Sequence, residues 1–171
     1  ARFYGFDSLV FLMADGTLRQ GGDAVPEELA SLSGVRDSFG GEEGVSFLDE
    51  KRILFSVPVE RDGQTVGILG GVRSLSYMRS LIQADGLFGQ SKTSIVGQDG
   101  SVIVFPEESG SFLELEGMAE GNGALAEEIC QVETDMEAGR SGVLQFESLE
   151  GEGMVLSYEP LDHYSWFLLT L

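Results

Sequence analysis

The segment ILFSVPVERDGQTVGIL, residues 53–69, constrains the fold more than any other part of this chain. Apolar runs flank Asp62-Gly63 on both sides. Asp-Gly between such runs is a strong hairpin signal, because a two-residue type I′ turn needs positive φ and glycine tolerates it. The segment therefore predicts two antiparallel strands joined by a tight turn.

A two-residue turn also predicts which side chains share a face of this hairpin. It would place Arg61 opposite Gln64 and Ser56 opposite Leu69. Because side chains alternate along a strand, one face would be apolar, with Phe55, Val57, Val59, Val66 and Ile68. The other face would combine Ser56 with the side-chain-free positions Gly67 and Gly71. A small polar residue among glycines is typical of a pocket floor, so we expect a ligand pocket there.

Charge and length limit the classes of function. The 171 residues carry a formal net charge of −19, which repels phosphate backbones, so we expect no nucleic-acid partner. The single cysteine, Cys130, rules out a disulfide within the chain but does not indicate a compartment. No apolar run approaches the roughly 20 residues of a membrane span. The chain does not begin with Met, and we expect it to be a piece of a longer protein.

The remaining pattern predicts an alternation of hairpins and helices. Further strand pairs are expected within 3–20, 94–105 and 153–171, with single strands at 45–48 and 142–148. Helices are expected at 26–32, 74–84 and 123–138, and a polar loop at 35–44. The last of these helices has an apolar stripe formed by Leu125, Ile129, Val132 and Met136.

This order occurs twice. Asp15-Gly16 and Asp99-Gly100 lie 84 positions apart, and each opens a half that reads hairpin, loop with helix, then three antiparallel strands. Two such halves predict an α+β fold with two tandem PAS-like units, each a five-stranded antiparallel sheet flanked by helices. We expect the units at 1–86 and 87–171, with the helix 74–84 as connector.

The chain resembles the double Cache domain, the extracytoplasmic sensor of bacterial transmembrane receptors. The resemblance rests on FSVPVERDGQTVGILGGV, SIVGQDGSVIVF and SYEPLDHYSWFLLTL and on their order along nearly the whole chain. It implies small-molecule sensing for a diguanylate cyclase, histidine kinase or chemoreceptor. It also implies a long N-terminal helix from one membrane span, a homodimer formed through that helix, and a second span after the last strand.

The resemblance further implies that the first, membrane-distal unit binds the ligand. Amino-acid-binding members carry an Asp after strand five, whereas this chain has Val72-Arg73-Ser74 there. Amino-acid binding is therefore not carried over. Our candidate ligand-binding residues are Arg36, Phe39, Ser56 and Arg73.

Arg73 and Ser56 each have a structural alternative that the sequence leaves open. Arg73 would form a bidentate pair with a carboxylate ligand, or a surface ion pair with one of the 29 acidic residues. Ser56 would contact the ligand or bond to its own neighbours. Arg36 and Phe39 lie in the loop region before strand three, where Phe39 would line a pocket.

Enzyme signatures are weak. Residues 121–126 spell G-x-G-x-x-A, but no strand precedes them as a dinucleotide site requires. One Cys and one His give no zinc spacing, and paired acids such as Glu127-Glu128 point apart on a helix. We expect no catalysis, no metal and no cofactor. The alternative to a sensor is a structural or protein-interaction module at the cell surface without a small-molecule ligand.

Overall fold

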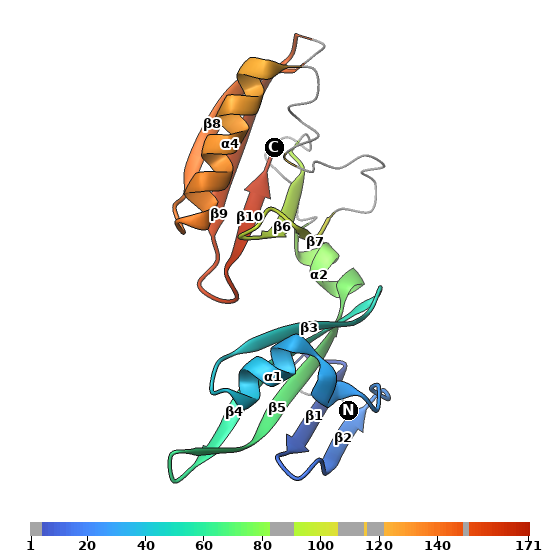
Figure 1. Ribbon diagram of the computed structural model, residues 1–171. Coiled ribbons are helices and arrows are strands. Elements are labelled where there is room, and N and C mark those ends of the chain that lie inside the picture. Colours follow the sequence, from blue (N-terminus) through green and yellow to red (C-terminus); the bar gives the residue numbers. More distant parts are fainter. Residues whose placement is uncertain (1–4, 83–90, 106–114, 116–121, 149–150) are drawn as a thin grey trace. The chain divides into compact units, whose positions relative to one another are not determined.

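A computed structural model describes residues 5–82, 91–105, 115, 122–148 and 151–171 of the chain (Figure 1). The chain divides into two compact units, Ala1–Met78 and Arg79–Leu171. Each unit contains one five-stranded antiparallel sheet, which confirms the expected α+β fold with two tandem PAS-like units.

The first unit is a sheet with one helix packed on it. Its strands are β1 (Ser8–Met13), β2 (Leu18–Gly22), β3 (Gly44–Asp49), β4 (Arg52–Arg61) and β5 (Gln64–Ser74), in the spatial order β2-β1-β5-β4-β3. The short helix α1 (Ser33–Phe39) follows a 3₁₀ turn, η1 (Leu29–Ser31), and lies against β3, β4 and β5 (Figure 1). The last strand continues directly into α2 (Leu75–Ile82).

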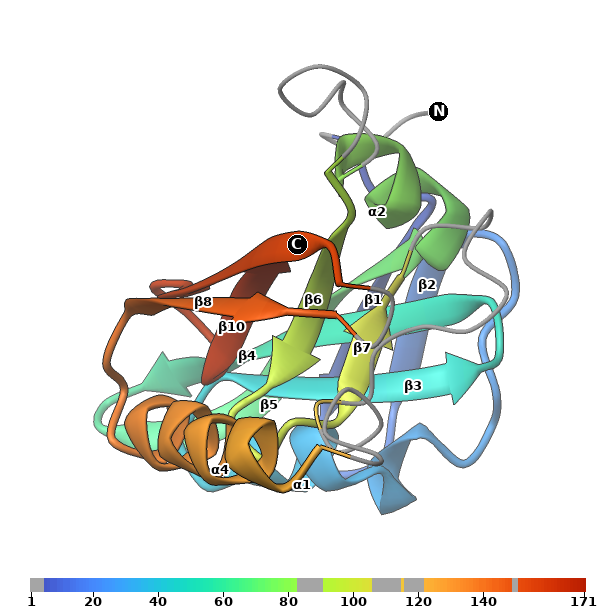
Figure 2. The ribbon, with the colours of Figure 1, turned by 90° about the horizontal axis from the view of Figure 1, so that it is seen from above.

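The second unit repeats this strand order. Its elements are β6 (Thr93–Gly97), β7 (Val102–Val104), α4 (Gly123–Glu137), β8 (Gly142–Glu147), β9 (Gly153–Pro160) and β10 (Trp166–Thr170), with the sheet ordered β7-β6-β10-β9-β8. Within this unit α4, the orange helix of Figures 1 and 2, lies along β8 and β9, as Figure 1 shows. The internal repeat inferred from the Asp-Gly turns is thus a repeat of topology.

Each sheet buries one face against its helix. The first core contains Val10, Leu12, Leu29, Val35, Leu54, Ile68 and Val72. The second contains Val96, Leu115, Leu125, Ile129, Val132, Met136, Leu156, Tyr158, Phe167 and Leu169. The predicted apolar stripe of α4 is confirmed, since all four of its residues are buried.

The Asp62-Gly63 turn is confirmed, but the predicted register beyond it is wrong. Both residues have positive φ, 53° and 75°, as a type I′ turn requires. A β-bulge then shifts the pairing, because Glu60 pairs with Thr65 while Val59 pairs with Gly67. The extra residue moves every later partner by one position. Ser56 therefore lies opposite Gly70 rather than Leu69.

The helix expected at 26–32 is wrong as well. That stretch contains only the η1 turn, whereas α1 begins just after it and continues into the segment expected to be a loop, 35–44. Gly34 obscured this helix, because glycine normally weakens a helix interior. Here it is required, since a Cβ on Gly34 would collide with the backbone of Val45, and a Cβ on Gly44 with the backbone of Gly34. Tertiary packing, rather than helix propensity, selects α1.

The predicted helix after β5 begins where expected. The Ser74 hydroxyl accepts a hydrogen bond from the backbone N–H of Tyr77 at 3.3 Å, as expected of an N-cap. Its expected end near Ala84 lies outside the described residues.

Candidate functional site

The sheet of the first unit has two different faces. The helix face, which α1 covers, carries Ser56 together with Leu54, Ile68 and Val72. The open face, on the opposite side, carries Phe47, Phe55, Val57, Leu69, Gly71 and Arg73, with Leu9 and Phe11 from β1. Apolar side chains remain accessible on the open face, since Phe47 is 44% exposed and Leu69 is 45% exposed.

The helix face holds Ser56 in a closed polar contact. Its side chain is 1% exposed, and its Oγ lies 2.8 Å from Ser38 Oγ on α1. The same hydroxyl lies 3.2 Å from the carbonyl oxygen of Gly34 and 3.3 Å from that of Gly44. The expected combination of Ser56 with Gly67 and Gly71 is wrong, because the bulge places both glycines on the open face. The Ser56 hydroxyl therefore bonds to its neighbours, as the structural alternative described.

Arg36 and Phe39 both lie on α1. Phe39 is partly buried and packs against the first core, whereas Arg36 is exposed in the last turn of the helix. Residues three apart on a helix are neighbours on its surface. The structure thus brings Arg36, Phe39 and Ser56 to the same side of the sheet.

Arg73 lies apart from these three, at the end of β5 on the open face. It pairs with Ile53 of β4, and its guanidinium carbon lies 3.9 Å from the ring centroid of Tyr77. The ring centroid of Phe6 is 5.3 Å from the same carbon. Both distances fall within the range of cation–π attraction.

The two aromatic partners of Arg73 were missed by the sequence analysis. Phe6 precedes the first strand and Tyr77 belongs to the connecting helix, so neither stands in a motif. Gly71 was the available signal: a glycine inside an apolar strand often marks a close approach, and a Cβ there would lie 2.6 Å from Phe6 ring atoms. The sequence alone does not indicate which residue makes that approach.

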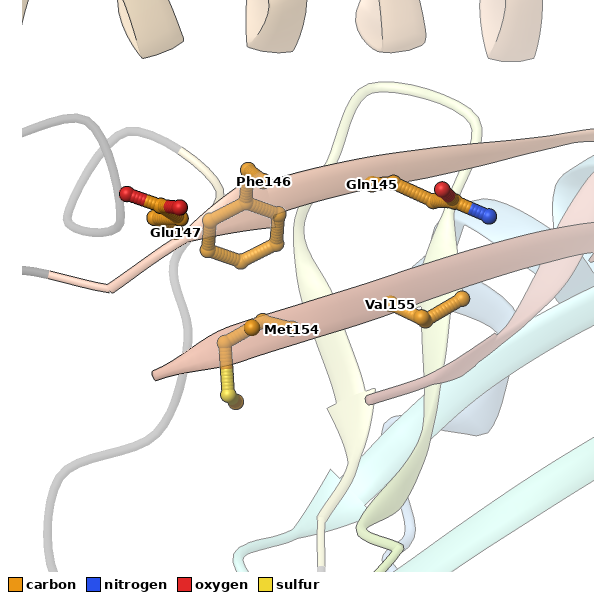
Figure 3. Close-up of a pocket in the computed structure, with 6 residues that line it drawn as sticks. Gln145, Phe146, Glu147, Met154 and Val155 are labelled. Atoms are coloured by element: carbon orange, nitrogen blue, oxygen red, sulfur yellow. The ribbon is translucent and has the colours of Figure 1, made fainter. Parts of the chain in front are cut away.

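The second unit has a shallow depression where β8 ends and β9 begins (Figure 3). Its volume is about 460 Å³, and its lining residues are Gln145, Phe146, Glu147, Gly153, Met154 and Val155. Phe146 and Met154 face each other across the strand pair and give it an apolar floor. The alternating apolar pattern of β8 was visible in the sequence, but it indicates a half-buried strand rather than a site.

Two of the acids with shifted pKa values in the described residues hold hairpin turns. The backbone and hydroxyl of Thr17 lower the pKa of Asp15, and hydrogen bonds from Ser101 lower the pKa of Asp99. Each of these aspartates belongs to an Asp-Gly turn, so its ionised form stabilises a hairpin. In the same part of the chain, no group of three or more His, Cys, Asp or Glu residues is arranged to hold a metal ion. No helix among the described residues is both long and apolar enough to cross a membrane.

No family model matches this chain, and no curated protein matches its sequence. Solved structures do match its fold. The ligand-binding domain of the Pseudomonas aeruginosa PAO1 amino acid chemoreceptor PctC, in complex with GABA, aligns with a TM-score of 0.65 at 20% identity. That alignment covers 96% of this chain and 73% of the other.

Two further structures give the same result. The ligand-binding domain of the P. aeruginosa PAO1 chemoreceptor PctB, in complex with L-Arg, aligns with a TM-score of 0.67 at 18% identity over 98% of this chain and 71% of that one. The periplasmic sensory domain of the Campylobacter jejuni chemoreceptor Tlp1 gives 0.67 at 13% identity, over 96% and 71%. The chain therefore has the tandem PAS-like fold of bacterial chemoreceptor sensor domains.

Proposed function

We propose that this chain is the extracytoplasmic small-molecule-sensing domain of a bacterial transmembrane signalling protein. The observation that carries the proposal is the match of both units together, over 96–98% of the chain, to sensor domains of chemoreceptors. Two of those neighbours are complexes with GABA and L-Arg. Attachment to the cell membrane through flanking spans, and dimerisation through a preceding helix, belong to the same proposal.

The connection between β5 and α2 supports a signalling role for the first unit. Ser74 ends the strand and Leu75 begins the helix, with no loop between them. The strand end is fixed by hydrogen bonds, because Ser74 N–H donates to Asp7 Oδ2 at 2.8 Å and Leu75 N–H donates to the Lys51 carbonyl at 2.7 Å. A ligand that binds one arrangement of this strand end more tightly would shift the population toward it, and α2 would follow.

The ligand-contacting residues remain a proposal within the first unit. Arg36 and Phe39 present a cation and a ring on α1, and Arg73 presents a cation on the open face. Ser56 would reach a ligand only if α1 moved away from the sheet, since its hydroxyl bonds to Ser38.

Thermal unfolding of this chain against separate panels of amino acids, carboxylates, polyamines, sugars and purines tests the proposal. A ligand at 100 times its Kd adds about 2.7 kcal/mol of stability, which is a readily measured shift of Tm. We expect one panel to raise Tm in a concentration-dependent way. A folded chain that responds to none of the five panels would contradict small-molecule sensing.

A protein-interaction module without a small-molecule ligand is the second candidate. It is favoured by the accessible apolar side chains of the open face, among them Phe47 and Leu69. Exposed apolar patches of this kind often mark interaction sites. This candidate predicts no Tm response to any panel. It also predicts that Leu69→Ser alters self-association or partner binding, measured by sedimentation, while the chain stays folded.

A further inference from the structure

Residues from three segments of the first unit surround the side chain of Arg73 at the open face of the first sheet. Its guanidinium lies over the Tyr77 ring at 3.9 Å and near the Phe6 ring at 5.3 Å. Its Nη2 also passes so close to Gly5 that a Cβ at that position would lie 2.5 Å away. Gly5 has φ of 89°, a conformation that other residues rarely adopt. Three segments of the first unit therefore meet around one cation.

The Phe6 ring is held in place from two directions. It lies on Gly71, where a side chain would exclude it. The next residue, Asp7, is hydrogen-bonded at both ends: its N–H donates to the Val72 carbonyl at 2.9 Å, and its Oδ2 accepts from Ser74 N–H. The lead-in to β1 is thus fixed to the end of β5, beside Arg73.

The Tyr77 ring is held by the start of α2. The backbone N–H of Tyr77 donates to Ser74 Oγ, which caps the helix. Leu75, the first residue of α2, is 6% exposed. Arg73 and Tyr77 therefore belong to one rigid junction between strand and helix. A guanidinium held against aromatic rings loses little further freedom when it binds a ligand, so the cation is preorganised.

Arg73 differs from the arginines that have acidic partners. Arg140 lies 2.6 Å from Asp135, and Arg52 lies 2.8 Å from Asp49. In the part of the chain that the structure describes, the side chain of Arg73 forms neither a hydrogen bond nor an ion pair. This is notable in a chain with 29 acidic residues and 10 basic ones. Ring contacts occupy the faces of a guanidinium, whereas its N–H donors point outward in its plane.

We propose that Arg73, held by Phe6 and Tyr77, binds the carboxylate of a small organic anion at the open face of the first sheet. This inference rests on the proposed sensing function and names its ligand class and its place. A guanidinium fits a carboxylate with two parallel N–H···O bonds. The apolar part of the anion would lie along the open face, toward Phe55 and Leu69, where Leu69 is 45% exposed.

The charge of the chain favours a monocarboxylate over a phosphate. Any anion approaches against a net charge of −19, and the repulsion grows with the charge of the ligand. A singly charged carboxylate with an apolar body gains burial on the open face and incurs less of this repulsion. Inorganic phosphate has the higher charge and no apolar part.

Calorimetric titration of the full chain in 150 mM NaCl, roughly physiological ionic strength, tests the proposal with butyrate and phenylacetate as probes. Butyramide and phenylacetamide, which keep the shape but lack the charge, are the matched neutral probes. We expect binding of at least one carboxylate and of neither amide. Arg73→Gln should abolish that binding, and Arg73→Lys should weaken it at least tenfold, because an ammonium group cannot make the bidentate pair. The charge-matched control Arg61→Gln, whose native side chain is 80% exposed at the hairpin tip, should bind like the wild type.

A second variant keeps the test decisive if Arg73→Gln fails to fold. Tyr77→Ala leaves the cation in place but removes the ring against it, and binding should weaken several-fold. In the wild type, the ¹⁵N resonance of Arg73 Nε should shift on addition of the carboxylate and not of the amide. A purely structural arginine would show no such shift.

The outcomes separate this inference from the proposed function. Equal carboxylate binding by the wild type and by Arg73→Gln would overturn the Arg73 site. If Arg36→Gln then lost carboxylate binding, the ligand would bind on the α1 side of the sheet and the sensing function would stand. Phosphate binding as tight as carboxylate binding would overturn the carboxylate class. A panel hit that is not a carboxylate would overturn the inference while sensing stands. No response to any panel would overturn both.

Discussion

The two units share a strand order but attach their helices by different means. In the first unit the 7-residue helix α1 approaches the sheet through glycine backbone contacts and a pair of hydroxyls, Ser38 and Ser56. In the second unit the 15-residue helix α4 packs through an apolar stripe. A repeated topology therefore does not fix how the helix is held. A short helix such as α1 needs close backbone contact to stay on its sheet. A long helix such as α4 buries enough apolar surface to be held without such contact.

The two units also differ in how a buried serine of the sheet is hydrogen-bonded. Ser56 in the first sheet has hydrogen-bonding oxygens on α1 and β3 around it. Ser94 on β6 is 0% exposed and faces the second core beside Leu169, yet its Oγ has no hydrogen-bond partner among the residues that the structure describes. An unpaired buried hydroxyl costs free energy, whereas a paired one contributes to specific packing.

The largest expected effect is that of Gly44→Ala. The added Cβ would overlap the backbone of Gly34, so α1 and β3 must separate. We expect a loss of at least about 3 kcal/mol in the free energy of unfolding of the first unit, measured by urea denaturation. Gly153→Ala, where a Cβ meets nothing within 4 Å, is the matched control in the second unit. Similar stability of both variants would show that α1 is not held by close contact.

The paired variants Ser56→Ala and Ser94→Ala sharpen the comparison. Ser56→Ala should cost about 1–3 kcal/mol, because Ser38 Oγ then loses its partner in a buried site. Ser94→Ala should be neutral or stabilise by up to about 1 kcal/mol, because it removes an unpaired hydroxyl. Thermal unfolding of both variants checks this. A comparable loss from Ser94→Ala would remove the difference that we draw between the two cores.

The smallest expected effect concerns the end of α4. Asp135 accepts hydrogen bonds from Arg140 at 2.6 Å and from the Tyr158 hydroxyl at 2.8 Å, and these interactions lower its pKa. A lowered carboxyl pKa in the folded state gives stability above the unfolded value, about 3.9, that is lost as the pH falls through the folded value. Asp135→Asn should therefore lower Tm at pH 7 and have less effect near pH 3.

The Tyr158 side of this contact should titrate in the opposite sense. Burial, together with the Asp135 carboxylate, raises the pKa of Tyr158 above its ordinary value of 10.0. Its stabilising contribution is present below pH 10 and lost above the raised value. Tyr158→Phe should remove that alkaline loss. A Tm difference between wild type and Asp135→Asn that does not change from pH 7 to pH 3 would contradict a stabilising role for the hydrogen bonds of Asp135 with Arg140 and Tyr158.

Local signals predicted most of the fold. The Asp-Gly turns depend on neighbouring residues, and the stripe of α4 depends on a period within one helix, so both were readable from sequence. Helix α1 was not, because Gly34 is explained by its contact with Val45 and Gly44, residues on another element. The bulge at Val66, opposite Val59 and Glu60, was missed as well, and a shift of one residue exchanges the two faces of a strand.

The site was predictable in part. The position of Arg73 after strand five follows from the hairpin, and its capacity for a carboxylate follows from its chemistry. Its partners Phe6 and Tyr77 lie 67 and four positions away, and only the fold brings the first of them to it. Ser56 was assigned to the wrong set of neighbours because the bulge was not anticipated.

The bulge at Val66 has a consequence for insertions and deletions in this hairpin. Removing Val66 would leave an unbroken ladder from Asp62-Gly63 in which every later pair is unchanged, so that Leu69 would stay on the open face and Ile68 on the helix face. Deleting one residue from each strand next to the turn would leave every later pair intact. The hairpin tip should therefore tolerate loss of the bulged residue as well as changes balanced between the strands, because both keep the core residues of the first unit on their present face.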